Sequence, residues 1–298
     1  MLYRTILMTG AQGQLGFELA RSLQGLGRIF ALNRQALDLA DFDQIRRVVR
    51  ELRPALIINP AAYTAVDQAE TEESVAMRIN ALAPGVLAEE AKRLNAVLVH
   101  YSTDYVFDGA KDGAYTEEDH PQPQNVYGRS KLAGERALAE VGAAHLVLRT
   151  SWIYGKRGKN FLLTMLRLAA QQPELRIVAN QYGAPTWSTT IAALSAQILA
   201  QGMALGHQDR DWWQEKSGIY HLSAAGSTSW YEFAQAIFAL APLAKQPKLT
   251  PLAASDYPTP AKRPANSLLS NDKLARTFNL FAPDWHDALR LCLCPESS

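Results

Sequence analysis

The segment Thr5–Gly16 reads TILMTGAQGQLG and places three glycines directly behind a run of apolar residues. The run predicts a buried β-strand over Thr5–Thr9, and the pattern after the glycines predicts a helix over Gln14–Leu26. In such a strand-to-helix turn, one glycine accepts a positive φ, a second lets the backbone approach a diphosphate, and a third lets the helix pack on the strand. The free N–H groups of the first helical turn attract phosphate. The glycines of this predicted dinucleotide-binding turn are Gly10, Gly13 and Gly16.

Two features leave the ligand of this turn open. The spacing G-x-x-G-x-x-G makes the turn one residue longer than G-x-G-x-x-G, and glycines also gather in strand–helix turns that bind nothing. The next predicted strand ends at Asn33-Arg34 rather than at an acid that would bind the adenosine ribose. Arg34 is either a surface arginine or a partner for a 2′-phosphate, which favours NADPH over NADH. Asp38 and Leu39 are expected at the adenine edge.

The first half of the chain alternates short apolar runs with longer amphipathic ones. The runs are rich in Val, Ile and Leu, as in strands buried on both faces of a parallel sheet. The expected strands are Thr5–Thr9, Arg28–Leu32, Ala55–Asn59, Val97–Ser102 and His145–Thr150. The expected helices are Gln14–Leu26, Asp43–Leu52, Glu72–Leu94 with a break at Pro84, and Tyr127–Glu140. This alternation predicts an α/β fold with a Rossmann-like, doubly wound parallel sheet.

After about Ser151 prolines become frequent and the predicted strands become shorter. The expected helices here are Phe161–Ala170, Ile191–Ala200 and Trp230–Ala241, and the expected strands are Arg176–Ala179 and Ile219–Leu222. We therefore predict a Rossmann domain over residues 1–151, to which the chain returns at about residues 175–215. Residues 152–298 are predicted to form mainly a smaller α+β substrate portion.

Composition excludes several classes of protein. The 298 residues are 48% hydrophobic and 20% charged, and the net charge is 30 − 29 = +1, which argues against disorder and against a nucleic-acid partner. No run of about 18 uncharged apolar residues is present, so no membrane span and a cytoplasmic location are expected. Two cysteines exclude a disulfide scaffold. Cys292 and Cys294 are expected to be reduced thiols on a terminal element, and no metal site is predicted.

A tyrosine and a lysine stand four residues apart, at Tyr127 and Lys131, and share one face of the predicted helix. A phenol has an ordinary pKa near 10, and a nearby ammonium is expected to lower it, so that the pair can exchange a proton with a carbonyl oxygen. Ser102 and Thr103 end the fourth predicted strand, at the sheet edge where α/β proteins bind ligands. Y-x-x-x-K alone recurs by chance in helices, and Ser/Thr also cap strand ends. The combination with the glycine turn is far more specific.

Further motifs extend along nearly the whole chain. They are GQLG at Gly13–Gly16, LDL near Asp38, NPAAYTAVDQAE at Asn59–Glu70, INALAP at Ile79–Pro84, HYSTDYVFDG at His100–Gly109, NVYGRSKLAGE at Asn125–Glu135, RTSWIYG at Arg149–Gly155, NQYGAPT at Asn180–Thr186 and RPANS at Arg263–Ser267. With these motifs the chain resembles the extended short-chain dehydrogenase/reductases and, within them, the dTDP-4-dehydrorhamnose reductase family.

The resemblance implies a role for each matching position. Tyr127 would protonate the C4 oxygen of the sugar, Lys131 would tune Tyr127 and hold the nicotinamide ribose, and Thr103 would bind the carbonyl oxygen. The positions expected to line the cofactor are Gly13, Gln14 and Leu15 at the diphosphate and Ala62, Tyr63 and Thr64 after the third strand. The positions expected at the sugar nucleotide are Thr103, Asp104, Trp152 and Arg263. For Arg263 a salt bridge is the competing interpretation, and for Asp104 a turn-stabilising carboxylate.

The resemblance also implies a reaction. It is the NADPH- or NADH-dependent reduction of dTDP-4-dehydro-β-L-rhamnose to dTDP-L-rhamnose, the last step in making this sugar donor for a cell-surface polysaccharide such as lipopolysaccharide O-antigen. Related 4,6-dehydratases carry Asp-Glu after the threonine, whereas this chain has Asp104-Tyr105, which fits reduction without elimination. The alternatives are a reductase or epimerase of another nucleotide sugar, and a non-catalytic cofactor-binding regulatory subunit.

Two positions depart from the family pattern. Asn180 stands where related sequences usually carry an aspartate, so a loop contact is expected to change. Some members hold Mg²⁺ with carboxylates at a dimer contact, whereas this C-terminal segment offers Cys292 and Cys294 in place of an acid. We therefore expect no metal, and a homodimer is the protein partner that the resemblance suggests.

Overall fold

The core of the molecule is a six-stranded parallel sheet. The computed structural model describes residues 4–204, 209–243 and 245–294. The strand order is β2-β1-β3-β4-β5-β10, and every neighbouring pair is parallel. The strands are β1 (Thr5–Met8), β2 (Arg28–Ala31), β3 (Leu56–Asn59), β4 (Val97–Thr103), β5 (His145–Thr150) and β10 (Gly218–His221). The α/β class and the five strands expected from the first half of the chain are confirmed.

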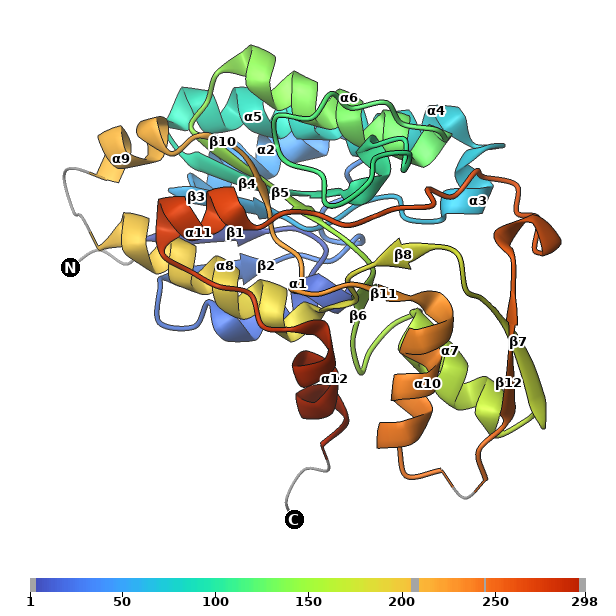
Figure 1. Ribbon diagram of the computed structural model, residues 1–298. Coiled ribbons are helices and arrows are strands. Elements are labelled where there is room, and N and C mark those ends of the chain that lie inside the picture. Colours follow the sequence, from blue (N-terminus) through green and yellow to red (C-terminus); the bar gives the residue numbers. More distant parts are fainter. Residues whose placement is uncertain (1–3, 205–208, 244, 295–298) are drawn as a thin grey trace.

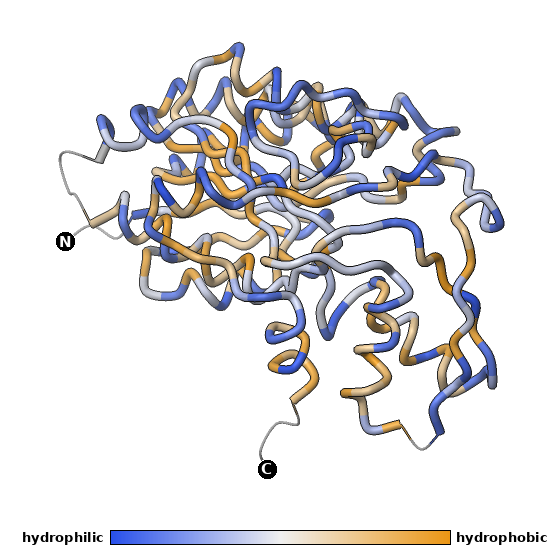
Figure 2. The backbone as a smooth tube through the Cα atoms, in the orientation of Figure 1, coloured by the Kyte–Doolittle hydropathy of each residue, from blue (hydrophilic) through white to orange (hydrophobic). Residues whose placement is uncertain are grey.

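Helices cover both faces of this sheet (Figure 1). One face packs on α1 (Gln14–Ser22), α8 (Ser188–Met203) and α11 (Asp272–Phe278), and the other on α2 (Phe42–Leu52), α5 (Ala83–Leu94) and α6 (Val126–Val141). The strands alternate between the two cores: Ile6 and Met8 of β1 lie in the first, and Leu7 lies in the second. Figure 2 shows the apolar residues gathered along these central strands.

The strand order locates the ligand edge of the sheet. The chain crosses from β1 to β2 on one side and then returns past β1 to β3, so β1 and β3 are neighbours whose connections diverge. Ligands of open α/β sheets bind beyond the carboxyl ends of the strands at such a switch point. The loops that begin at Thr9, Pro60 and Asp104 follow the carboxyl ends of β1, β3 and β4.

A smaller lobe lies beside the sheet, at the lower right of Figure 1. Its strands are β6 (Ile153–Tyr154), β7 (Glu174–Val178), β8 (Tyr182–Gly183), β9 (Thr186–Trp187), β11 (Thr228–Ser229) and β12 (Lys248–Leu252). Its helices α7 (Phe161–Ala169) and α10 (Trp230–Leu240) share a core with α12 (Trp285–Leu293). Ser229 and Glu232 form a capping box that begins α10. Cys292 is buried in this core, and Cys294, just after α12, is exposed.

Two expectations about individual elements are wrong. Ile219–Leu222 was expected in the smaller portion, but β10 extends the main sheet, because Ile219 and Tyr220 pair with Val147 and Leu148 of β5. The helix expected over residues 72–94 does not break at Pro84, because this proline lies in the first turn of α5, where its missing N–H costs nothing. The irregularity lies earlier, in the π-helical turn η1 (Arg78–Leu82), which follows α4 (Glu73–Met77).

The chain leaves the sheet after β5 and rejoins it with α8 and β10, whereas β7 pairs with β12 in the smaller lobe. The domain division at residue 151, with a return at about residues 175–215, stays a prediction. The remaining short elements are α3 (Val66–Ala69), η2 (Asp104–Val106), α9 (Asp209–Glu215) and η4 (Ala254–Asp256). None of the helices within the described ranges is long and apolar enough to cross a membrane.

Candidate active site

Each of the three glycines after β1 lies where an added side chain would crowd a neighbouring residue. Gly10 has φ +59°, and a Cβ there would lie 3.0 Å from the Cβ of Ala61 after β3. A Cβ on Gly16 would lie 2.1 Å from the carbonyl oxygen of Gly10. Gly13 begins α1 without a side-chain cap, and its N–H donates to the Gly10 carbonyl at 2.9 Å. The first N–H groups of α1 therefore have no side-chain partner, and the glycines keep the surface in front of them open. Such a surface fits a diphosphate.

The side chains of Gln14 and Leu15 serve other contacts. The Gln14 Oε1 accepts from Asn160 Nδ2 at 2.7 Å and so ties the turn to the start of α7. Leu15 is buried in the core under α1. The backbone N–H groups of both residues, in the first turn of α1, are therefore the parts that face the predicted diphosphate site.

The residues after β2 are arranged as an open surface turn. The Asn33 side chain accepts from Ala36 N at 3.0 Å, and Asp38 accepts from Ala40 N at 2.9 Å. Arg34 is 80% exposed, and its Nε lies 3.9 Å from Asp38, so this ion pair holds it only weakly. Leu39 is buried in the core, so its side chain is not at the surface predicted for the adenine.

The loop after β3 is fixed by a residue that sequence reasoning missed. Asn80, buried in the π-helical turn η1, accepts from the Tyr63 N–H at 2.8 Å and donates to the Tyr63 carbonyl at 3.0 Å. It also donates to the Ser130 hydroxyl at 3.0 Å, and Ser130 in turn donates to the Tyr127 carbonyl at 2.8 Å. Asn80 thus joins the loop containing Ala62, Tyr63 and Thr64 to the helix that carries Tyr127. The signal available in the sequence was the polar residue inside the apolar motif INALAP.

Tyr127 and Thr103 meet at the carboxyl end of β4. Asn125 caps α6 by accepting from Gly128 N at 2.8 Å, which sets Tyr127 in the first turn of the helix. Thr103 is the last residue of β4, and its hydroxyl, which donates to Asp104 Oδ1 at 3.0 Å, lies close enough to the Tyr127 phenol to oppose the rise of its pKa. The Tyr105 ring meets the Tyr127 ring edge to face at 5.6 Å. The structure therefore brings the predicted pair of carbonyl-binding groups together.

Burial, not the lysine, dominates the acidity of Tyr127. Burial raises the pKa of Tyr127 above its ordinary value of 10.0, although the Thr103 hydroxyl opposes this. The expectation that Lys131 lowers this pKa is therefore wrong for the isolated chain. The Nζ of Lys131 instead donates to the Tyr101 carbonyl at 2.6 Å and lies 3.0 Å from His100 Nε2. Burial lowers the pKa of Lys131 to about 8.

Asp104 is a buried carboxyl group beside Thr103. Burial raises the pKa of Asp104 to about 6, against hydrogen bonds that include the Thr103 hydroxyl at 3.0 Å. The carboxyl group therefore changes charge near neutral pH, so it can both donate and accept hydrogen bonds there. Both the substrate contact and the turn-stabilising role considered from the sequence are compatible with this position.

Trp152 is locked between two neighbours. Its backbone has φ +47°, which is rare for a residue with a side chain. Its ring stacks on Trp230 with centroids 3.4 Å apart and an interplanar angle of 7°. A Cβ on Gly183 would lie 2.5 Å from the other side of the Trp152 indole. With both ring faces covered, the edge of Trp152 is the part left for a substrate.

Gly183→Ala tests this packing. Because the new methyl group overlaps the Trp152 ring, the ring must leave Trp230, and we expect the free energy of unfolding to fall by about 1–3 kcal/mol. Chemical denaturation measures this loss, and the change in tryptophan fluorescence reports the broken stack. An unchanged denaturation midpoint together with an unchanged spectrum would contradict the packing described.

Arg263 forms the salt bridge that was one of its two interpretations. Its Nη2 lies 2.7 Å from Asp67 Oδ2, and Asp67 Oδ1 accepts from Ala261 N at 3.2 Å. The guanidinium also lies 5.9 Å from the Tyr105 ring, which contacts Tyr127. The Arg263 Nη1 is buried and has no hydrogen-bond partner within the described residues. Arg263 therefore keeps one donor group that Asp67 does not use.

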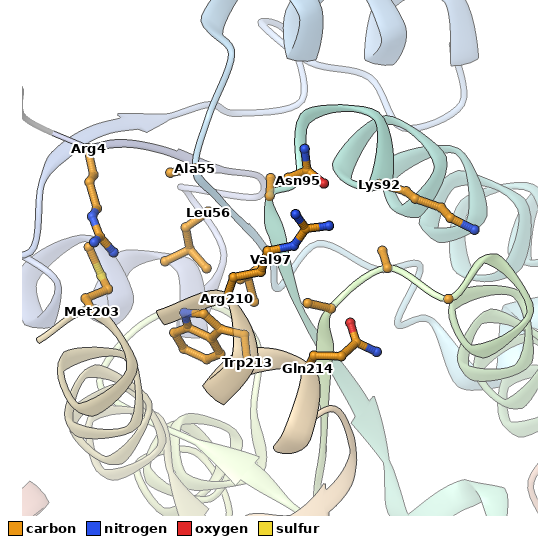
Figure 3. A pocket seen from close by; sticks show the side chains of 14 residues that line it. Arg4, Ala55, Leu56, Lys92, Asn95, Val97, Met203, Arg210, Trp213 and Gln214 are labelled. Carbon is orange, nitrogen blue, oxygen red and sulfur yellow. The ribbon is translucent and has the colours of Figure 1, made fainter. Parts of the chain in front are cut away.

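A cavity of about 430 Å³ lies elsewhere, at the amino-terminal edge of the sheet (Figure 3). Ala55 and Val97 of its lining stand at the starts of β3 and β4, and its cationic side chains are Arg4, Lys92 and Arg210. Lys92 already donates to the Val141 carbonyl at the end of α6, at 2.6 Å. None of the residues predicted for the cofactor or substrate lines this cavity.

The Asn180 departure has a visible local effect. Its side-chain Oδ1 accepts from Ala254 N at 2.7 Å, where η4 begins. The amide oxygen makes this contact without a charge. The loop that precedes β8 is thus joined to the segment after β12.

Comparison with known proteins agrees over nearly the whole chain. The family described as the RmlD substrate binding domain matches residues 4–297. A dTDP-4-dehydrorhamnose reductase of Burkholderia thailandensis is 48% identical over 97% of both chains, and one of Escherichia coli K12 is 42% identical over 97% of this chain and 96% of its own. The crystal structure of a dTDP-4-dehydrorhamnose reductase from Bacillus anthracis in complex with NADP has a TM-score of 0.89 and 36% identity, covering 98% of this chain and 99% of that one.

Proposed function

Because the chain belongs to the RmlD substrate binding domain family, we propose that it reduces the C4 keto group of dTDP-4-dehydro-β-L-rhamnose to give dTDP-L-rhamnose. It is an oxidoreductase that uses NADPH or NADH, in line with the NADP bound to its relative from Bacillus anthracis. The product is the sugar donor of the rhamnose pathway. One observation carries the proposal: Thr103 at the end of β4 and Tyr127 in the first turn of α6 lie side by side at the ligand edge of the sheet.

The glycine turn fits a dinucleotide. The backbone N–H groups at the start of α1 would hold the diphosphate, Arg34 a 2′-phosphate, and the loop of Ala62–Thr64 would lie along the dinucleotide. The obstruction that any Cβ at Gly10 or Gly16 would cause supports this fit. When bound, the reduced nicotinamide supplies a hydride to C4 of the sugar.

Thr103 and Tyr127 act on the oxygen of the keto group. Both donate hydrogen bonds to it, which stabilises the negative charge that develops there. Tyr127 then delivers its proton as the general acid, and its raised pKa means that the phenol is fully protonated at neutral pH. Lys131, one helical turn away, would hold the nicotinamide ribose, the other role that the resemblance gives it.

The sugar nucleotide would lie between this edge and the smaller lobe. Asp104 and the edge of Trp152 would contact the sugar, and the unused Nη1 of Arg263 would grip a phosphate oxygen of the dTDP group. Tyr105 stands where an elimination would need a second acid, and its ring instead contacts Tyr127 and Arg263. This arrangement supports reduction without loss of water.

The direct test is to follow NADPH oxidation with enzymatically made dTDP-4-dehydro-β-L-rhamnose and to identify the product. Formation of dTDP-L-rhamnose is expected. Turnover of a different nucleotide sugar, and not of this one, would establish the other reductase or epimerase. Cofactor binding without turnover of any dTDP-sugar would establish the regulatory subunit. The homodimer and the cytoplasmic location expected from the sequence stay predictions.

Arg34→Ala tests the cofactor preference. Because the exposed guanidinium would bind the 2′-phosphate that only NADPH carries, we expect KM for NADPH to rise roughly tenfold, with KM for NADH unchanged. Arg47→Ala, which removes an exposed arginine of α2, is the matched control. Equal changes with both cofactors, or no change, would leave Arg34 as a surface residue.

A further inference from the structure

Four buried polar side chains form a continuous line beneath the proposed site. Thr9 Oγ1 donates to Asn59 Oδ1 at 2.7 Å, Asn59 Nδ2 lies 3.1 Å from His100 Nδ1, and His100 Nε2 lies 3.0 Å from Lys131 Nζ. The line crosses from the end of β1 through β3 and β4 to α6. Each of these residues is at most 1% exposed. Lys131 is a catalytic residue of the proposed reaction. Its Nζ therefore contacts a line of side chains that the proposed reaction does not use.

His100 stays uncharged in this line. Burial lowers its pKa well below the ordinary 6.5, and the positive charge of Lys131 and the proximity of His145 act in the same direction. A neutral imidazole carries one N–H and one lone pair. His100 can therefore present either a donor or an acceptor to Lys131, depending on which ring nitrogen holds the proton.

Two hydrogen-bond arrangements keep all three contacts of the line. With Lys131 neutral, the Thr9 hydroxyl donates to Asn59 Oδ1, Asn59 Nδ2 donates to His100 Nδ1, and His100 Nε2–H donates to the lysine lone pair. With Lys131 charged, the ammonium donates to His100 Nε2, Nδ1–H donates to Asn59 Oδ1, and the turned amide donates to Thr9 Oγ1. The change takes one proton from solvent onto Lys131 and moves the ring proton from Nε2 to Nδ1.

The charged arrangement gains more from His100 than the neutral one. Hydrogen bonds to an ionised donor are roughly twice as strong as those between neutral groups. Among the described residues, the hydrogen-bond partners of Nζ are His100 and the Tyr101 carbonyl. The nearest carboxylate along α6, Glu135, favours the charged lysine but is itself paired with Arg149 and Ser102.

We propose that His100, held by Asn59 and Thr9, is a positioning residue that fixes the Lys131 ammonium and sets the pH range in which Lys131 is charged. The proposal rests on the reductase function above for its catalytic consequence. The hydrogen-bond geometry is independent of that function. Below the pKa of Lys131 the ammonium is present to bind the nicotinamide ribose, and it is lost as the pH rises through that pKa.

The first experiment follows Lys131 in the free protein. With ¹³Cε-labelled lysine, the resonance that disappears in Lys131→Met reports its titration, which is expected near pH 8 in the wild type. In His100→Leu we expect the midpoint to fall by about one pH unit, because the ammonium loses an acceptor while its burial persists. His100→Gln, whose side-chain oxygen can accept in place of Nε2, is expected to stay near the wild-type midpoint. An unchanged midpoint in His100→Leu would overturn the proposal.

The matched control is Ser195→Ala, which removes the hydroxyl bonded to Tyr101 Oη at 2.8 Å from the opposite face of β4. It should leave the Lys131 midpoint unchanged. A second measurement uses the wild-type protein alone and records the ¹⁵N chemical shifts of the His100 ring. They should show the Nδ1–H form at low pH and the Nε2–H form at high pH, with the midpoint of Lys131. A single tautomer throughout that titration would overturn the linkage even if His100→Leu failed to fold.

Steady-state kinetics test the effect of His100 on the reaction. In His100→Leu the basic limb of kcat against pH is expected to move down by the same amount, with KM for the sugar unchanged. A rise in KM without a shift of the limb would identify a merely structural role. Absence of turnover in the wild type would refute the proposed function, while the two NMR titrations would still decide the role of His100.

Discussion

Tyr127→Phe is expected to lower kcat by about 10²-fold or more with the nucleotide-sugar substrate, the scale of a lost general acid. The phenol is half-buried, its raised pKa keeps it fully protonated at neutral pH, and it lies beside Thr103, so it is the proton donor of the proposed reaction. Phenylalanine keeps the ring and its contact with Tyr105 but removes the donor. Pre-steady-state and steady-state NADPH oxidation would measure the loss.

The control for this variant is Tyr220→Phe. It removes another phenol, one that donates to the Lys216 carbonyl at 2.8 Å and lies away from the ligand edge. Its kcat is expected to remain close to that of the wild type. Near-normal turnover by Tyr127→Phe, with an unchanged melting temperature, would remove Tyr127 from the mechanism.

Gly16→Ala is expected to weaken NADPH binding by about 10²-fold or more. The added Cβ would stand 2.1 Å from the Gly10 carbonyl oxygen, and that oxygen belongs to the backbone, so the turn and α1 must separate. Their separation moves the N–H groups that are proposed to hold the diphosphate. Overpacking of this kind also lowers the free energy of unfolding by about 1–3 kcal/mol. Titration calorimetry gives the dissociation constant.

Gly85→Ala provides the comparison for this substitution. Gly85 lies within α5, and its Cβ would meet only the Ala137 Cβ at 3.4 Å, a distance at which methyl groups pack normally. The Gly85→Ala variant should bind NADPH with the affinity of the wild type. Wild-type affinity in Gly16→Ala would show that the close approach of turn and helix is not needed for the dinucleotide.

The parts of the fold that could be predicted are those that one local pattern determines. The runs ending at Met8, Asn59 and Thr103 are short, rich in Val, Ile and Leu at their starts and followed by turn residues, which indicates buried strands. The strand expected over Ile219–Leu222 is present as β10 (Gly218–His221), but the local pattern did not reveal that it belongs to the main sheet. Its place in the sheet depends on pairing with β5, a contact that no local pattern contains.

The same distinction holds for the site. Glycine has no side chain, so its spacing after a strand already indicates a close approach, and the contacts of Gly10 and Gly16 agree with that. Asn80 escaped because its partner is the backbone of Tyr63, in the loop after β3, a contact that the folded chain makes and no local pattern contains. The partners of Lys131 escaped because His100 lies on β4 and Lys131 on α6, so that only the folded chain brings the two side chains together.

The position of β10 has a consequence for synthesis of the chain on the ribosome. Strand β5 is complete at Thr150, but its outer edge pairs only with residues Gly218–His221, after the whole intervening segment has been made. Until then the nascent sheet exposes the unpaired N–H and C=O groups of a strand that carries three consecutive apolar side chains, Leu146, Val147 and Leu148. Such an edge can pair with another chain, so the interval between the emergence of β5 and that of β10 is the period in which the growing protein is most open to aggregation.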